Sequence, residues 1–492
     1  MRYEIIRRIV LSEKHVLIAI LAFASACSQS DTAPIATGTN ETAIAFESQS
    51  GEIVDAYRGT FSVPENRATP DSRTLALHYV RFPSTNDDPG PPIVYLAGGP
   101  GGSGAWFAGS WRFPLFMALR EFGDVIAFDQ RGTGESNDTP TCTSSKRIVD
   151  TAVTSDKAFV EMHQAALREC MAFWEDHGVD LRGYTTVQNA IDLDDLRRHL
   201  GAEKLSLWGI SYGSHLALAA LKQMGDRIDR VVIASAEGLD QTIKLPARTD
   251  DYFGRLQQAT DSQSSEASIS LDLRASMRSV HARLEESPLK LVVPQEDEDA
   301  VEVLFQRRDM QRLAASMIAD PGRFANQLVH IYAELDRGET GPLVAALQRR
   351  LEPNAAISFR AMPVMMDIAS GAGNGRRMLI EEQAQTALLG QFLSDTLYLI
   401  DAAPSYGLGN SFREKPVSEV PLLLLSGTLD GRTYIESQRE AVSGLKNRQL
   451  VTVRNAGHNL FMVSPEVTET ILEFMRGEPV DGREIVVDLP EF

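Results

Sequence analysis

Three residues of this sequence have the types and the order that acyl-transfer chemistry requires. The first is Ser211, which lies between two glycines in the segment 209–213 (GISYG), after an apolar run that begins at Leu205. This Gly-x-Ser-x-Gly pattern predicts a tight turn between a buried strand and a helix, which exposes the serine hydroxyl at the edge of a sheet. A serine hydroxyl is a weak nucleophile by itself, so it requires a base that takes its proton and an acid that orients that base.

The base and the acid are expected downstream, each in a loop that follows an apolar strand. His458 follows the run at 449–453 and is the one histidine of nine that lies beyond residue 330. Asp430 follows four consecutive leucines at 422–425, although an Asp-Gly pair is also common in turns without a catalytic role. Because catalytic groups gather where the strands of an open sheet end, the order Ser211, Asp430, His458 predicts a catalytic triad.

The negative oxygen that develops during acyl transfer requires backbone N–H donors. We expect one donor at Tyr212, the residue after the nucleophile, and the other at Gly99 in the glycine-rich segment 98–104 (GGPGGSG). The same segment fits the glycine spacing of a dinucleotide-binding turn, with Asp129 at the end of the next strand. Pro100 inside the turn and the two strands expected before it disfavour that alternative, which would also leave the serine, aspartate and histidine without a role.

An alternation of strands and helices must position these loops. Strands are expected at 57–66, 74–83, 91–97, 124–129, 205–210, 230–234, 420–425 and 449–453, and helices at 111–122, 186–200, 212–224 and 466–476. Several of these strands are apolar throughout, as strands buried on both faces are. The alternation predicts an α/β fold in which helices cover both faces of a mostly parallel sheet.

Between about residues 240 and 415 the pattern changes to amphipathic helical segments with few strand runs. Helices are expected there at 247–259, 270–285, 308–335, 341–351 and 376–400. This change predicts a helical cap at 240–417, inserted between two parts of a core at 51–239 and 418–492. The acidic run 296–299 lies in the cap, where we interpret it as a solvated loop.

Composition and charge narrow the class of partner. The chain has 492 residues, of which 43% are hydrophobic and 23% charged, and this is the composition of an ordinary globular protein. Its net charge is −19, whereas a nucleic-acid-binding protein requires a basic surface. The charge therefore disfavours a nucleic acid as the partner, whereas the predicted triad leads us to expect a peptide or a small acyl substrate; the sequence does not indicate an oligomeric state.

Residues 1–26 have the features of an export signal peptide. Basic residues precede an 11-residue apolar stretch at 16–26, which is shorter than the about 20 residues that span a bilayer. An Ala-Ser-Ala cleavage site precedes Cys27, and this pattern resembles the lipidation site of bacterial lipoproteins. We expect export to the periplasm or cell envelope, a lipid anchor on Cys27 as the membrane attachment, and a flexible tether at 27–50.

The other two cysteines, Cys142 and Cys170, then remain as an even pair. In an oxidising compartment we expect them to form a disulfide, and two separate buried thiols are the alternative. Neither cysteine has a second cysteine at C-x-x-C spacing, so a metal site is not expected at either position.

Four motifs together resemble the α/β-hydrolase fold and, within it, the serine peptidases of the prolyl iminopeptidase and tripeptidyl aminopeptidase type. They are GGPGG at 98–102, DQRGTGES at 129–136, GISYG at 209–213, and the pair Asp430 and His458. The segment GTFSVP at 59–64 is also similar to the exported, tripeptidyl branch. The resemblance covers about residues 55–240 and 418–478 and leaves out the cap.

The resemblance implies a serine aminopeptidase that releases N-terminal residues or short peptides through an acyl-enzyme, without a metal or cofactor. An esterase with the same triad is the alternative, because cap residues select the substrate. Holding the free ammonium group of a peptide requires carboxylates, and the candidates are Glu237 and Asp240, followed by Asp250 and Asp251. The candidates for the pocket wall are Trp106 and Trp111.

Overall fold

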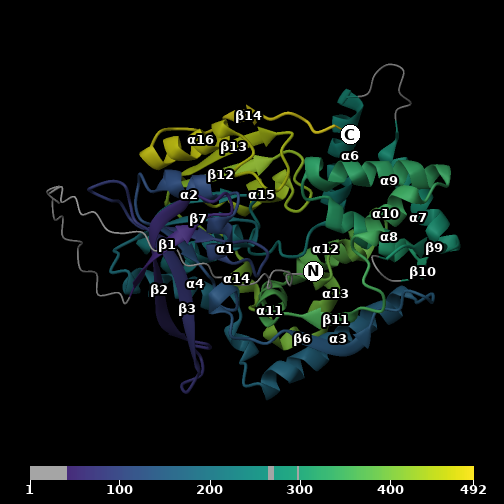
Figure 1. Ribbon diagram of the computed structural model, residues 1–492, viewed down its shortest axis with the longest axis horizontal. Helices are drawn as coiled ribbons and strands as arrows, with labels where there is room; N and C mark the ends of the chain where they lie inside the picture. The colour runs from purple at the N-terminus through teal and green to yellow at the C-terminus, as the bar shows by residue number, and fades with distance from the viewer. Residues whose placement is uncertain (1–40, 264–270, 296–298, 492) are drawn as a thin grey trace, which may run out of the picture. The chain divides into compact units, whose positions relative to one another are not determined.

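The structure is a computed structural model, which describes residues 41–263, 271–295 and 299–491 (Figure 1). The expected signal peptide, Cys27, most of the expected tether and most of the acidic run 296–299 lie outside the described residues. Within the described ranges, no helix is long and apolar enough to span a bilayer.

The core of the described chain is one sheet of ten strands. Across the sheet the order is β1 (Thr42–Glu47), β2 (Ile53–Pro64), β3 (Thr74–Phe82), β5 (Val125–Phe128), β4 (Ile93–Leu96), β7 (Leu205–Ile210), β8 (Ile228–Ala234), β12 (Leu422–Gly427), β13 (Arg448–Arg454) and β14 (Glu484–Val486). The pairs β1–β2, β2–β3 and β3–β5 are antiparallel, and the remaining pairs of this sheet are parallel. The mostly parallel sheet predicted from the sequence is confirmed.

The apolar central strands are explained by burial on both faces. In β12, Leu422 and Leu424 belong to one core cluster, whereas Leu423 and Leu425 belong to the cluster on the opposite face. The first cluster includes α4 (Thr186–His199) and α5 (Tyr212–Met224), and the second includes α1 (Gly104–Gly109), α2 (Phe113–Leu119) and α16 (Pro465–Arg476). Since full burial of a leucine contributes about 1.5–3 kcal/mol, these strands anchor the sheet to both helical layers.

The predicted cap lies between β8 and β12. Its residues 252–347 form a hydrophobic cluster of their own, whereas Met362, Ile380 and Tyr398 belong to the core cluster that includes α4 and α5. Its elements are α6 (Pro246–Gln263), α7 (Leu273–Glu286), β9 (Leu289–Val293), β10 (Val301–Phe305), α8 (Arg307–Met317), α9 (Asn326–Arg337), α10 (Gly341–Gln348), β11 (Ala356–Phe359), α11 (Ala361–Ser370), α12 (Asn374–Ala384), η5 (Gly390–Leu393), α13 (Thr396–Leu399) and α14 (Asn410–Arg413). The single helix expected at 308–335 is two helices, because a proline at 321 cannot continue the hydrogen-bond ladder.

The cap also packs on a segment of the first core part. Strand β6 (Cys142–Arg147) pairs antiparallel with β11 of the cap, and helix α3 (Asp156–Asp176) packs against both strands (Figure 1). A disulfide between Cys142 and Cys170 joins β6 to α3, with an S–S distance of 2.01 Å. Of the two alternatives for these cysteines, the structure has the disulfide.

Part of the segment expected to be a flexible tether is instead ordered. Residues Thr42–Glu47 form strand β1, which pairs antiparallel with β2. The reason is the alternation of apolar residues there: Ile44 and Phe46 pack against the core, and the ring of Phe46 lies 5.0 Å edge-on from that of Phe82. The predicted boundary at residue 50 is therefore wrong for these six residues.

Candidate active site

Ser211 occupies a strained turn between β7 and α5. Its backbone has φ 56° and ψ −125°, in a region that non-glycine residues seldom adopt. A Cβ atom on Gly209 would lie 2.7 Å from the carbonyl oxygen of Gly213, and one on Gly213 would lie 2.0 Å from that of Leu96. Both flanking positions thus require glycine, because strand, turn and helix approach one another at backbone contact.

Asp430 and His458 lie in the loops after β12 and β13, and they are hydrogen-bonded to each other. The Nδ1 atom of His458 lies 3.0 Å and 3.1 Å from the two carboxylate oxygens of Asp430. Asp430 is fully buried, and Nδ1 is occupied by this contact, so Nε2 is the nitrogen left for proton transfer. Among the described residues no hydrogen bond joins Ser211 to His458; such contacts are often longer in hydrolases without substrate.

Several donors hold the Asp430 carboxylate in its ionised form. It accepts hydrogen bonds from the backbone N–H groups of Arg432 and Thr433, at 2.8 Å and 2.9 Å, and from the Thr433 hydroxyl at 2.7 Å. Burial by itself would raise the pKa of Asp430, but the charge and hydrogen bond of His458 and the contacts with Thr433 outweigh it. The pKa therefore lies below its ordinary value, and the carboxylate is fixed as an acceptor for the imidazole.

The glycine-rich loop after β4 lies against the Ser211 turn. A Cβ atom on Gly98 would lie 2.7 Å from the carbonyl oxygen of Ile210, and Gly99 has φ 129°. In the described part of the chain, neither the N–H of Gly99 nor that of Tyr212 has a hydrogen-bond acceptor. Two free backbone donors thus lie near Ser211, as the stabilisation of an oxyanion requires.

The DQRGTGES segment positions this loop from the neighbouring strand. Asp129 accepts hydrogen bonds from the Ser103 hydroxyl, at 2.7 Å, and from the N–H of Ala105, at 3.1 Å. The amide of Gln130 donates to the carbonyl of Ala97 at 2.9 Å. These contacts fix both ends of the glycine loop.

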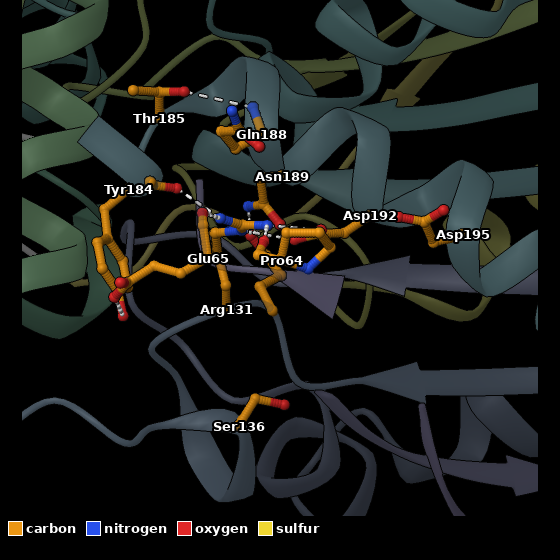
Figure 2. A network of polar contacts seen from close by, with 12 residues as sticks. Pro64, Glu65, Arg131, Ser136, Tyr184, Thr185, Gln188, Asn189, Asp192 and Asp195 are labelled. Carbon is orange, nitrogen blue, oxygen red and sulfur yellow. Dashed lines mark hydrogen bonds and ion pairs between the residues drawn. The ribbon is translucent and has the colours of Figure 1, made fainter. Parts of the chain in front are cut away.

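Arg131 of the same segment is fully buried and holds the core together (Figure 2). Its guanidinium forms two hydrogen bonds of 2.6 Å with Asp192 on α4 and donates to the carbonyl oxygens of Glu65 and Gly183. Figure 2 shows Glu65 and Asp192 beside Arg131, from two other segments of the chain. The role of Arg131 is therefore to join the loop after β5 to β2 and α4.

The cap contacts the loop of His458 through residues 319–321. The backbone N–H of His458 donates to the carbonyl of Ala319 at 2.9 Å. The next residue, Asn459, donates from its backbone at 3.0 Å and from its amide at 2.5 Å to the carboxylate of Asp320. The cap therefore positions the backbone on both sides of the imidazole.

Two glycines allow this close approach of the cap. A Cβ atom on Gly431 would lie 2.2 Å from the carbonyl oxygen of Ile318, and one on Gly457 would lie 2.6 Å from the ring of Pro321. Gly431 directly follows Asp430, and Gly457 directly precedes His458. Ile318 thus contacts the loop of Asp430, and residues 319–321 contact the loop of His458.

Ser211 lines a pocket with a volume of about 330 Å³ between the core and the cap. The walls are formed by Gly99 and Pro100, by residues 431–434 after β12, and by side chains of α8, α11, η5 and α13. Glu237 also lines the pocket, where it pairs with Lys244.

The other predicted binding residues do not line this pocket: Asp240, Asp250, Asp251, Trp106 and Trp111. The carboxylate of Asp240 accepts the backbone N–H of Gly373, and that of Asp250 accepts the N–H of Leu388 at 3.0 Å. Trp106 and Trp111 are each 45% exposed.

Asp367 on α11 is a pocket residue that the sequence analysis missed. It accepts a hydrogen bond of 3.4 Å from the Thr396 hydroxyl and has no basic partner within 4.0 Å among the described residues. Burial, together with the negative charge of Glu237, raises the pKa of Asp367 to about 7. A single acid in the apolar helix AMPVMMDIAS was the available signal.

The sequence of this chain matches one known protein family over most of its length. The family described as "alpha/beta hydrolase fold" matches residues 91–465, which include every loop described above. The chain belongs to the α/β-hydrolase family. In an α/β-hydrolase, a serine at the strand-to-helix turn and groups at the ends of later strands face one substrate site.

Curated relatives of this α/β-hydrolase bear peptidase names. Serine protease Hip1 of Mycobacterium tuberculosis is 30% identical over 194 residues, which is 37% of this chain and 36% of the relative. Tripeptidyl aminopeptidase of Streptomyces coelicolor is 27% identical over 214 residues, or 39% of each chain. The chain thus spans well under half the length of these relatives. Among solved structures, an epoxide hydrolase from an endophytic Streptomyces has 14% identity and a TM-score of 0.39, over 87% of this chain and 99% of its own.

Proposed function

We propose that this α/β-hydrolase is an exported serine aminopeptidase, with Ser211 as nucleophile, His458 as base and Asp430 as the acid that orients the base. The observation that carries the proposal is the hydrogen bond between His458 and the buried Asp430, next to a pocket lined by both Ser211 and Asp367, which has no basic partner within 4.0 Å in the described chain. The peptidase names of the relatives support the same reaction class.

In the proposed reaction, Ser211 Oγ attacks the carbonyl carbon of a peptide bond while His458 Nε2 takes its proton. The N–H groups of Gly99 and Tyr212 stabilise the oxyanion that forms. The C–N bond then breaks as His458 returns the proton to the leaving amine, which leaves an ester on Ser211. Water, deprotonated by His458, hydrolyses this ester and restores the hydroxyl.

The charges of the pocket support an amino-terminal substrate group over a neutral acyl group. Glu237 is neutralised by Lys244, whose charge helps to hold the pKa of Glu237 below its ordinary value despite burial. Asp367 has no such partner in the described chain, and a bound ammonium group would favour its ionised form. We therefore assign the substrate ammonium to Asp367, with Glu237 beside it.

The test compares hydrolysis of peptide anilides with a free amine, their N-acetylated twins and a short-chain ester. We expect cleavage of the free-amine anilides only, and a loss of at least about 10⁴-fold in kcat in Ser211→Ala. Ser443→Ala is the matched control, because Ser443 lies on the surface and its hydroxyl binds only a local carbonyl. Ser211-dependent cleavage of the ester alone would contradict the peptidase assignment and establish the esterase.

Export and lipidation of Cys27 form part of the proposal. Supporting observations are the signal-like residues 1–26 and the Cys142–Cys170 disulfide, since disulfides persist in oxidising compartments. Mass spectrometry of the N-terminal peptide from a membrane fraction tests it: we expect an acylated Cys27, and an unmodified residue with the signal peptide retained would contradict it.

A further inference from the structure

The pocket beside Ser211 holds three acidic and three basic side chains. They are Glu237, Lys244, Arg312, Asp367, Asp395 and Arg432. Two pairs neutralise each other: Lys244 with Glu237, and Arg312 with Asp395 at 3.3 Å. One acid, Asp367, and one base, Arg432, are left without an oppositely charged partner within 4.0 Å in the described chain.

Arg432 is held at the pocket wall with most of its donors unused. Its backbone N–H binds Asp430, and its Nη1 donates to the carbonyl of Ala315 on α8 at 3.0 Å. Within the described ranges the guanidinium makes no other hydrogen bond, and the side chain is exposed. The contact with Ala315 fixes one edge of the guanidinium group, and its other N–H donors remain available to a ligand.

The chemistry of this group selects the ligand. A guanidinium binds a planar carboxylate with two parallel hydrogen bonds, which an ammonium group cannot do. Asp367, the one pocket acid without a basic partner within 4.0 Å among the described residues, disfavours a doubly charged anion such as a phosphate ester. A singly charged carboxylate fits both conditions.

We propose that Arg432 binds a carboxylate of the substrate, so that this enzyme prefers short peptides that carry a free carboxylate as well as a free amine. This inference rests on the proposed peptidase function. A pocket of about 330 Å³, with a free acid and a free base on its walls, matches a short zwitterionic peptide. The carboxylate comes either from the C-terminus of the peptide or from an acidic side chain.

The test measures kcat/KM for two pairs of peptides by chromatographic detection of the products. One pair is tri-alanine with a free C-terminus and tri-alanine amide; the other is Ala-Glu-Ala-amide and Ala-Gln-Ala-amide. In the wild type we expect the carboxylate member of one pair to react about tenfold faster. In Arg432→Gln this ratio should fall to about one, whereas Arg439→Gln, a surface arginine on the next helix, should keep it.

The outcomes separate the two proposals. Loss of the ratio in the first pair identifies the C-terminal carboxylate, and loss in the second identifies an acidic side chain; either supports the subsite. Ser211-dependent hydrolysis with equal rates within both pairs overturns the inference and leaves the peptidase function intact. Absence of hydrolysis for all four peptides, by a folded wild type, overturns the inference, and the peptidase function is overturned as well when the free-amine anilides also remain uncleaved.

Discussion

The ionisation of Asp367 is the residue-level feature with the clearest functional consequence. Burial and the charge of Glu237 raise its pKa to about 7, so that its carboxyl group is largely protonated below that pH. An ammonium ligand requires the ionised form, because a neutral carboxyl offers no charge to pair with it. Affinity for the amine should therefore rise with pH up to about 7, and fall again above about pH 8, where the α-amine of the peptide loses its own proton.

We predict that, in a Ser211→Ala background, the Kd of a free-amine peptide increases about tenfold for each pH unit below the pKa of Asp367. Calorimetric titration measures this. The Ser211→Ala/Asp367→Asn double variant should bind the peptide more weakly, and its Kd should change less with pH because the titrating carboxyl is gone. All other titrating groups are common to the two proteins. Equal profiles in the two proteins would exclude Asp367 as the ammonium ligand.

Arg131 gives a second prediction at the residue scale. Its replacement by methionine removes the guanidinium and leaves the buried carboxylate of Asp192 with Arg67 as its remaining basic partner. Breaking a buried ion pair in this way costs about 3–5 kcal/mol. We therefore expect Arg131→Met to lower the free energy of unfolding by about that amount in urea titrations. An unchanged midpoint would show that the network in Figure 2 contributes little to stability.

At the scale of elements, the segment 318–321 connects the predicted cap to the loop of His458, the proposed base. Asp320 binds Asn459, and Ala319 binds the backbone of His458, so displacement of this segment would move the imidazole. Small misplacements of catalytic groups can reduce rates by up to about 100-fold. Asp320 is thus assigned as a positioning residue.

We predict that Asp320→Ala lowers kcat by about tenfold to 100-fold with little change in KM. Glu339→Gln, an exposed cap variant, should leave both constants unchanged. Steady-state kinetics, together with the melting temperature, distinguish a loss of activity caused by displacement of His458 from one caused by lower stability. A fall in kcat that parallels a fall in melting temperature, or a change confined to KM, would contradict positioning of His458.

Helices and strands could be predicted from the sequence where residues close together in the chain determine them. The apolar runs of β7 and β12 fill both faces of the sheet, and Gly209 and Gly213 are required by local clashes, so the strands and the serine turn could be predicted. The pairing of β6 with β11 joins segments more than 200 residues apart and has no local signal. The same limitation hid Asp367 and Arg432, whose positions beside Ser211 depend on how the cap packs on the core.

At the scale of the whole molecule, the disulfide cross-links the segment 142–170, against which β11 of the predicted cap packs. It closes a loop of 28 residues between β6, which pairs with the cap, and α3. A cross-link of this length restricts the unfolded chain and contributes about 3–4 kcal/mol. The Cys142→Ser/Cys170→Ser variant should therefore lose about that much unfolding free energy and keep its activity at low temperature. Denaturant titration checks this, and wild-type protein in reductant is the control; equal stability of the oxidised and serine forms would contradict it.

Reaction with a fluorophosphonate, followed by peptide mapping in a mass spectrometer, tests whether Ser211 is the nucleophile. We predict one adduct per chain, on Ser211, which is absent in Ser211→Ala and forms far more slowly in His458→Gln. An adduct on another serine, or a folded wild-type protein that does not react, would show that Ser211, His458 and Asp430 do not form a nucleophilic centre.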